Sequence, residues 1–429
     1  MRKMSTVELQ IAERARKFKG EALYNLHHFI DADMLQESYE QLNKRSAWGI
    51  DGKTWEEYGK GFEERRGSLL AEFKSGVYRA PAIRRVYIPK DKFGQRPLGI
   101  PTIEDKVLQA SVRKVIEPIY EEDFKSFSYG FRPGRSQHQA IEYMFRQVSF
   151  EGKRYIIEAD LKNCFGSIDH GILRSFLDKR VKDGVVRRMI DKWLSAGVME
   201  SGNVSYPEGG TPQGGIISPL LSNVYLHYVL DGWFEEQIQP KLKGKSFMVR
   251  WADDFIMGFR DKKDAERVLE VLPKRFARYN LELHPGKTKM IDLNSHRGES
   301  GRSFEFLGFT HYLGESRKGK EVLKRKTSPR RLSRAIGEIS RYVKLNRHMK
   351  LGDLLAEINS KLRGHYSYYG ITFNYDGIHR FYEQVKRNLY KWLNRRGGKR
   401  ILVWDEFCVV IYHQYPLIKP LIYHTYTLS

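Results

Sequence analysis

The sequence has very little cysteine and no long apolar run, and these two shortages exclude several classes of protein. Its two cysteines, Cys164 and Cys408, can build neither a disulfide framework nor a cysteine-rich zinc site, and they fit a reducing cytosol. The N-terminus is charged throughout and lacks the apolar core of a signal peptide. The longest stretch without Lys, Arg, Asp or Glu, 209–230, holds two prolines and four glycines, so we expect no membrane helix there.

Acidic residues are scarce relative to basic ones, because 52 Asp and Glu face 75 Lys and Arg, giving a net charge of +23 over 429 residues. Most of this excess lies in residues 317–400, where 23 basic and 6 acidic side chains are interleaved with Tyr and Trp. Such a region is expected for a partner rich in phosphate groups. The alternative is a solvated helical surface whose lysines serve solubility.

The hydrophobic periodicity and the turn residues predict a chain of mixed helix and strand. We expect helical structure over residues 5–45, 54–73, 102–120, 136–148, 169–180, 184–196, 218–238 and 262–278, and through the region that follows 326. Strands are expected over residues 84–89, 95–100, 154–161, 288–292 and 304–312, with two further segments within 247–259. The first two of these strands should form a hairpin around a turn at 90–94.

Two adjacent carboxylates, Asp253 and Asp254, interrupt an apolar hairpin. Like charges in a poorly hydrated place are unfavourable unless cations bind there, and Mg²⁺ prefers oxygen ligands. Asp160, at the end of the strand 154–161, is the candidate for a third carboxylate. Such a triad would support in-line phosphoryl transfer, with one metal activating a 3′ hydroxyl and another stabilising the leaving pyrophosphate. The alternative is a surface turn with two solvated aspartates.

Seven short motifs follow one another along the chain. They are Gly99-Ile100-Pro101 with Asp105-Lys106, Tyr129-Gly130-Phe131-Arg132-Pro133-Gly134-Arg135-Ser136, Asp160-Leu161-Lys162-Asn163-Cys164-Phe165 with Ile168-Asp169-His170, Gly210-Thr211-Pro212-Gln213-Gly214-Gly215 with Ser218-Pro219-Leu220-Leu221-Ser222-Asn223, Trp251-Ala252-Asp253-Asp254, Leu283-His284-Pro285-Gly286-Lys287-Thr288, and Phe306-Leu307-Gly308-Phe309. In order and spacing they resemble the reverse transcriptases of bacterial group II introns, also called intron-encoded maturases. Trp251 stands where that family usually has Tyr, and Gly166 replaces an acid that is common after the Phe.

The resemblance covers nearly the whole chain and implies an α+β, right-hand polymerase. Residues 1–150 would form an N-terminal extension and the fingers, partly interleaved with the palm. Residues 151–315 would form the palm, with an antiparallel sheet and the catalytic aspartates, and 316–400 a helical thumb or maturase domain. The 29 residues 401–429 contain no Cys-x-x-Cys, so the resemblance is to the type that lacks an endonuclease. We expect them to pack back on the thumb or to contact RNA, and we expect no cleavage of a second DNA strand by this chain.

The resemblance also implies roles for particular residues. Two Mg²⁺ ions, with Mn²⁺ as a possible substitute, would bind at Asp160, Leu161, Asp253 and Asp254, and the three aspartates would be catalytic. The incoming nucleotide would contact Lys90, Arg96, Phe165, Gln213 and Lys287. Primer or RNA would contact Arg132, Arg135, Leu307, Gly308, Arg363, Arg395 and Arg396.

Phe165 matches the aromatic residue that excludes a 2′ hydroxyl, and Leu307-Gly308 the hairpin that supports the primer end. From the residues alone, Lys90 and Arg96 could be exposed cations at strand ends, and Phe165 an ordinary core residue. The aromatics of the basic region could stack on unpaired bases or fill the core of a helical bundle.

The function that the resemblance implies is RNA-directed DNA polymerisation in a bacterial cytoplasm. The partners would be an RNA template with a DNA primer, dNTPs, a DNA target, and the group II intron RNA whose splicing and mobility the protein assists. Two alternatives remain. One is a non-catalytic RNA-binding maturase with a relic polymerase site, which a primer-extension assay would separate. The other is a domesticated reverse transcriptase in phage defence or repair, which only the flanking DNA would reveal.

Overall fold

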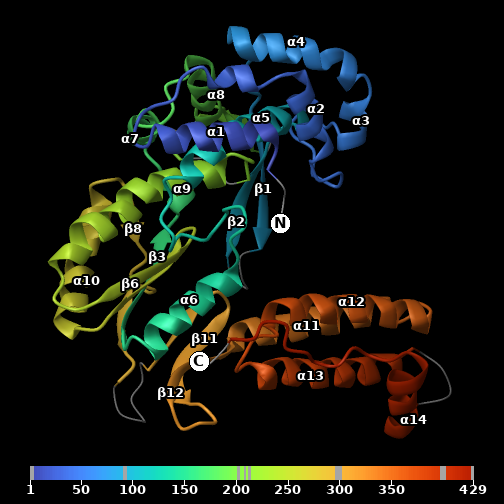
Figure 1. The fold of residues 1–429 in the computed structure, drawn as a ribbon. Helices are drawn as coiled ribbons and strands as arrows, with labels where there is room; N and C mark the ends of the chain where they lie inside the picture. The colour runs from blue at the N-terminus through green and yellow to red at the C-terminus, as the bar shows by residue number, and fades with distance from the viewer. Residues whose placement is uncertain are drawn as a thin grey trace. The chain divides into compact units, whose positions relative to one another are not determined.

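The computed structural model describes residues 4–89, 94–200, 203–206, 209–210, 214–294, 302–396 and 402–426. Lys90 and Gln213 lie outside these ranges, as does the turn that joins the hairpin strands. The chain forms two compact units, one of residues 1–140 and 159–290 and the other of residues 141–158 and 291–429. Both contain helices and strands, which confirms the mixed fold (Figure 1). The finer division into fingers, palm and thumb stays a prediction.

In the first unit, helix α5, Ile103–Glu121, is buried along most of its length. Its start is capped, because the Thr102 side chain accepts a hydrogen bond from the Asp105 amide. Helices α1, Thr6–Lys17, and α2, Ala32–Glu40, pack against α5. The other helices of this unit are α3 Trp55–Gly59, α4 Phe62–Ser75, α7 His170–Leu177, α8 Gly184–Leu194, α9 Ser218–Leu226 and α10 Lys262–Ala277, with short 3₁₀ segments at Leu26–Phe29, Cys164–Ser167 and Gln239–Lys241.

Two predicted long helices are broken by residues with positive φ. Residues 5–45 contain a break with Gly20 and Asn25 in the left-handed region, and 54–73 breaks at Gly61 into α3 and α4. The expected helix 218–238 is α9 followed by two π-helical segments, His227–Asp231 and Trp233–Ile238. Each π turn holds one residue more than an α turn, so it changes which side chains point toward the core.

The segments that carry Asp160, Asp253 and Asp254 meet on a sheet with the strand order β6-β7-β3-β8. The strands are β3 Tyr155–Lys162, β6 Ser246–Trp251, β7 Asp254–Phe259 and β8 Glu282–Leu283. The apolar strands β6 and β7 pair in antiparallel register with Trp251 opposite Asp254, as the sequence predicts. Helix α10 packs on β7 and β8, and β3 lies beside β7 (Figure 1).

A second sheet of this unit has the order β2-β1-β4-β5. The predicted hairpin is confirmed, because β1 Ile83–Pro89 and β2 Gln95–Ile100 pair in antiparallel register, with Ile88 opposite Arg96. Strands β4 Val198–Glu200 and β5 Asn203–Ser205 extend it, β4 running parallel to β1. These two short strands were not predicted from the sequence.

The second unit combines a three-stranded antiparallel sheet with a helical bundle. The sheet order is β10-β11-β12, with β10 Ser303–Phe306, β11 Phe309–Glu315 and β12 Glu321–Thr327. In the bundle α11 Pro329–Asn346, α12 Leu351–Tyr369 and α13 Tyr375–Leu393 lie side by side (Figure 1). The unit also contains most of α6, Gln137–Ser149, and α14 Trp404–Val409, which continues as a π segment, Val410–Gln414. Strand β9, Lys289–Asp292, lies at the boundary between the units.

Aromatic residues of the basic region divide between core and surface. Tyr366, Phe381 and Tyr382 belong to the buried core of the bundle, together with Phe407 of α14. His365 is stacked on Phe381 with ring centroids 3.7 Å apart, and burial lowers its pKa to about 4, which fits a structural role. Some of the aromatic residues of the basic region therefore fill the core of the helical bundle. Trp392 and Tyr390, in contrast, are only half-buried.

The described tail residues pack on the bundle, as expected. The Pro416 carbonyl accepts a hydrogen bond from Asn359, whose side-chain oxygen accepts from the Ile418 amide. Further along, the amides of Tyr423 and His424 donate to the Gly370 carbonyl. A Cβ atom at Gly370 would stand 2.4 Å from the Leu421 carbonyl oxygen, so this close approach requires glycine.

Asp105 of α5 is a buried carboxylate, and it predicts a pH dependence of stability. It accepts hydrogen bonds from Trp193 Nε1 (2.8 Å) and the Tyr78 hydroxyl (3.1 Å), while burial raises its pKa to about 6. The raised pKa means that the folded state keeps a proton that the unfolded state releases. The stabilisation is therefore complete below about pH 4 and is lost as the pH rises through 6.

We expect Asp105→Asn to flatten the dependence of Tm on pH between 4.5 and 7. The Asn side-chain oxygen can still accept both hydrogen bonds, and on the order of 3 kcal/mol of pH-dependent stability would disappear. Thermal unfolding at a series of pH values measures this. Asp33→Asn, at an exposed carboxylate, is the matched control and should leave the slope unchanged. Identical slopes in wild type and Asp105→Asn would contradict the prediction.

Candidate active site

The Asp253-Asp254 pair lies at a two-residue β turn between β6 and β7. Trp251 pairs with Asp254, so Ala252 and Asp253 form the tip, and Ala252 has φ of 58°. A positive φ at the first central residue is typical of type II′ turns, which favour glycine there. An alanine in this conformation costs free energy, and the surrounding structure must hold it in place.

The loop that contains Tyr129-Gly130-Phe131 packs directly on this turn. The Arg250 amide donates to the Phe127 carbonyl and the Tyr129 amide donates to the Arg250 carbonyl, both at 2.9 Å. A Cβ atom at Gly130 would stand 2.4 Å from the Ala252 nitrogen, so only glycine permits this contact between main chains.

Asp160 and Asp253 come together at this turn. Burial raises the pKa of Asp253, and the negative charge of Asp160 raises it further, whereas the cations Arg96 and Lys287 act in the opposite direction. Lys287 forms an ion pair with the Asp160 carboxylate. It reaches that position because β8 pairs with β3, and the turn that follows β8 is closed by hydrogen bonds from Lys287 and Thr288 to the His284 carbonyl.

The carboxylates Asp160 and Asp253 fit a divalent cation, because oxygen ligands with mutually unfavourable charges are what such a cation neutralises. Asp254 is the first residue of β7. Because neighbouring strand residues point to opposite faces, its side chain lies on the face opposite to that of the next residue, Phe255. Within the described ranges, no group of three or more His, Cys, Asp or Glu side chains is arranged to hold a metal. Leu161 follows Asp160 on β3 and is buried, paired with Leu283.

Phe165 lies in a 3₁₀ turn, Cys164–Ser167, immediately after β3. It is half-buried, so it does not belong to the buried core, while its neighbour Cys164 does. Burial raises the pKa of the Cys164 thiol to about 12, with the Asp253 charge contributing, so this cysteine stays protonated. A Cβ atom at Gly166 would meet only the end of the Asn163 side chain, at 2.4 Å, whereas one at Gly210 would stand 2.9 Å from the Gly166 Cα, so main-chain contact requires glycine at 210.

The ends of the loop that carries Gln213 are fixed, although Gln213 itself lies outside the described residues. Gly210 donates its amide to the Ile168 carbonyl and accepts a 2.6 Å hydrogen bond at its own carbonyl from His170 Nε2. Beyond Gln213, the Ile216 amide donates to the side-chain oxygen of Gln109 on α5 (2.8 Å). Arg96, on β2, is exposed, and its positive charge acts to lower the pKa of Asp253. Lys90 lies outside the described residues.

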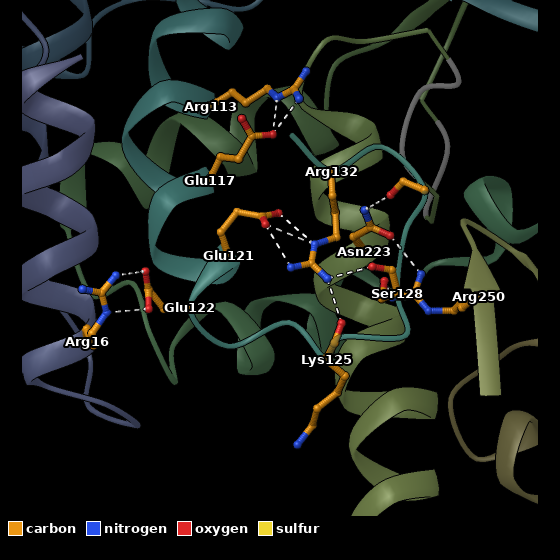
Figure 2. Close-up of polar contacts among 11 residues, drawn as sticks. Arg16, Arg113, Glu117, Glu121, Glu122, Lys125, Ser128, Arg132, Asn223 and Arg250 are labelled. Atoms are coloured by element: carbon orange, nitrogen blue, oxygen red, sulfur yellow. Dashed lines mark hydrogen bonds and ion pairs between the residues drawn. The ribbon is translucent and has the colours of Figure 1, made fainter. Parts of the chain in front are cut away.

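The structure places Arg132 inside the protein. It is 7% exposed, its guanidinium forms an ion pair with Glu121 (2.9 Å), and it donates to the carbonyls of Lys125 and Ser128 (both 2.8 Å), as Figure 2 shows. Through these contacts the Arg132 side chain stabilises the loop of residues 125–132. Arg135 is more exposed and stacks over the Tyr129 ring, with 5.5 Å between the guanidinium carbon and the ring centroid.

The second unit contains the other residues assigned to primer or RNA. Leu307 and Gly308 form the two-residue turn between β10 and β11, both with positive φ, as in a type I′ turn. The Tyr368 hydroxyl donates to the Leu307 carbonyl and the Ser328 amide to the Gly308 carbonyl. Arg363, on α12, is exposed.

Three cations gather around the Trp392 ring on the surface of the bundle. Lys344 of α11 lies 5.4 Å from the ring centroid, and Lys391 and Arg395 each lie 5.2 Å from it. All three are exposed. Arg396 differs, because it is half-buried and donates to the Met349 carbonyl. We call Lys344, Lys391, Arg395 and Trp392 the Trp392 cluster.

Comparison with known proteins identifies the class. A family model described as reverse transcriptase (RNA-dependent DNA polymerase) matches residues 88–311, just over half of the chain, so the chain belongs to that family. Within it, the chain is similar to the group II intron-encoded protein LtrA of Lactococcus lactis subsp. cremoris, with 36% identity over 221 residues, 51% of this chain and 36% of that protein. It is also similar to protein YkfC of Escherichia coli K12, with 39% identity over 186 residues, 43% of this chain and 48% of that protein.

A more distant similarity is to the nuclear intron maturase 4, mitochondrial, of Arabidopsis thaliana, with 26% identity over 160 residues, 37% of this chain and 20% of that protein. These names confirm the expected resemblance to group II intron reverse transcriptases and maturases. The matched stretches span less than half the length of each of these relatives. Among the helices that the structure describes, none is long and apolar enough to cross a membrane.

Proposed function

We propose that this chain is an RNA-directed DNA polymerase that uses Asp160, Asp253 and Asp254 for two-metal phosphoryl transfer. The observation that carries the proposal is the approach of Asp160 and Asp253 at the β6–β7 turn, beside Lys287 and within reach of the Arg96 charge. The bound Mg²⁺ ions would activate the primer 3′ hydroxyl and stabilise the leaving pyrophosphate. Asp160 and Asp253 would hold the ions, while Arg96 and Lys287 would bind and orient the triphosphate.

The test is primer extension with purified protein, an RNA template, a DNA primer, dNTPs and Mg²⁺. Full-length cDNA is the expected product. Binding of structured RNA without any extension would instead support the non-catalytic maturase, whose polymerase site is a relic.

We further propose that the basic second unit binds group II intron RNA and so assists splicing and mobility. Its support is the similarity to intron-encoded proteins and the Trp392 cluster, which offers cations for phosphates and an indole for an unpaired base. A splicing assay with a group II intron RNA tests this, since faster splicing is expected only when the protein is present.

Phe165 predicts the choice of sugar. Its half-buried ring follows Asp160 by five residues, so truncation to alanine should open space beneath the sugar of the incoming nucleotide. We expect Phe165→Ala to lower the preference for dNTP over rNTP about 10- to 100-fold, because sterics alone discriminate by roughly 1–3 kcal/mol. Single-nucleotide incorporation of dNTP and rNTP measures the ratio.

Phe165→Tyr is the matched control, since it keeps the ring, and its preference should stay within about 3-fold of wild type. A preference in Phe165→Ala equal to that of wild type would show that Phe165 does not select the sugar and only packs against its neighbours.

A further inference from the structure

A buried guanidinium lies directly behind the catalytic turn. Arg250, the penultimate residue of β6, is 0% exposed. Its Nε and Nη2 donate to the two carboxylate oxygens of Asp231 at 2.7 and 2.5 Å. Its Nη1 donates to the Asn223 side-chain oxygen (2.9 Å) and to the Ala252 carbonyl (3.0 Å), and Nη2 also donates to the Ser128 hydroxyl (2.7 Å). All three guanidinium nitrogens are therefore engaged.

These contacts hold the turn from two sides. Arg250 binds the carbonyl of Ala252, the residue with positive φ, directly. Asn223, which Arg250 fixes, donates its amide to the Gly130 carbonyl at 2.8 Å, and Gly130 packs on the Ala252 nitrogen. Figure 2 shows Asn223 between Arg250 and the 125–132 loop. One side chain thus connects β6, α9, the Gly130 loop and the catalytic turn.

Asp231 faces Arg250 from the end of the first π segment, His227–Asp231. It too is 0% exposed, so the ion pair is removed from water. Burying such a pair contributes little to stability compared with apolar residues of similar volume, so stability alone does not explain it. A planar group with five donors in a rigid fork fixes more acceptors, and in a more definite geometry, than a lysine ammonium with its three rotatable donors.

We propose that Arg250 is a positioning residue for the metal-binding turn, and that Asp231 in turn orients Arg250. Arg250 holds Ala252 in its left-handed conformation and so directs the Asp253 carboxylate toward Asp160. This inference rests on the proposed polymerase function. It adds a requirement for the metal site that involves neither a metal ligand nor a nucleotide contact.

The test compares Arg250→Lys with Arg180→Lys. Arg180 is a matched control, because it is 1% exposed and also forms an ion pair, with the half-buried Asp123 at 2.7 Å, but its remaining contacts are carbonyls at the end of α1 and the segment after it. Both variants keep the positive charge and lose donors. Measurements are kcat and KM for dNTP with the active fraction titrated, Tm, and Mn²⁺ binding to the protein alone by electron paramagnetic resonance.

We expect Arg250→Lys to lower kcat about 30-fold with KM for dNTP changed less than about 3-fold, and to weaken Mn²⁺ binding about 10-fold. Both variants should lower Tm by similar amounts. Arg180→Lys should nevertheless leave kcat and Mn²⁺ binding within about 2-fold of wild type. Equal kcat and equal Mn²⁺ affinity in the two variants would overturn the inference.

The Mn²⁺ measurement separates this inference from the proposed function. If the wild-type protein extends no primer, the polymerase function fails. Weaker Mn²⁺ binding in Arg250→Lys than in Arg180→Lys would then still support the positioning role, and equal binding would refute it.

Discussion

Asp253→Asn is expected to abolish cDNA synthesis while leaving the protein at least as stable as wild type. A neutral amide would be a much poorer ligand than a charged carboxylate for the divalent cations that Asp253 would hold, and losing about 4 kcal/mol of transition-state stabilisation lowers the rate about 1,000-fold. In the metal-free protein, however, the Asp253 charge is unfavourable, because burial and Asp160 both raise its pKa. Neutralising it removes that repulsion, so Tm without Mg²⁺ should be equal or higher.

Primer extension, thermal unfolding without Mg²⁺ and RNA filter binding on the same preparation check this prediction. Asp178→Asn is the control, since Asp178 is exposed, pairs with the half-buried Arg187 and belongs to no proposed site. It should behave like wild type in all three assays. Extension by Asp253→Asn above a few per cent of wild type would show that Asp253 is not a metal ligand. A lower Tm would show that Asp253 has a structural role.

The parts of the fold that could be predicted are those in which a local pattern decides the conformation. The β6–β7 hairpin follows from two apolar segments around two carboxylates, and α5 from a Thr102 cap before apolar residues at helical spacing. Strand β12 was missed, because Lys324, Arg325 and Lys326 resemble a basic surface. Arg325 is instead 0% exposed, and it lies 4.7 Å from the Tyr426 ring centroid and 5.3 Å from that of Phe145.

The candidate site shows the same limit. The aspartates and Lys287 lie within recognisable motifs. By contrast, Arg250 contacts the side chains of Ser128, Asn223 and Asp231, which lie 122, 27 and 19 positions before it in the chain. The π segment that brings Asp231 into position has no simple sequence signature. One signal was available, since an arginine interrupts an apolar strand next to the aspartates, and a charge in that place needs a buried partner.

The Trp392 cluster leads to the second prediction of large effect, which concerns RNA affinity. Lys344, Lys391 and Arg395 are exposed and lie within 5.4 Å of one ring centroid, so their like charges are concentrated where a phosphate chain would relieve the repulsion. If each contacts one phosphate, replacing all three with Gln should lower the slope of log Kd against log salt by about 2 to 3. At 0.1 M salt, the affinity for structured RNA should fall about 100-fold or more.

Filter binding over a range of salt concentrations measures both quantities, and the control must carry the same change in net charge. Arg317, Lys318 and Lys320 are exposed in the turn between β11 and β12 of the same unit, so their triple Gln variant provides it. That variant should lose only the weak, long-range part of the attraction, roughly a few-fold in affinity, because its charges contact no phosphate and are screened by salt. If both triple variants lose affinity equally, the net charge of the unit governs RNA binding and the Trp392 cluster is not a contact site. A 100-fold loss confined to the Lys344, Lys391 and Arg395 variant would locate the RNA on the α11–α13 surface.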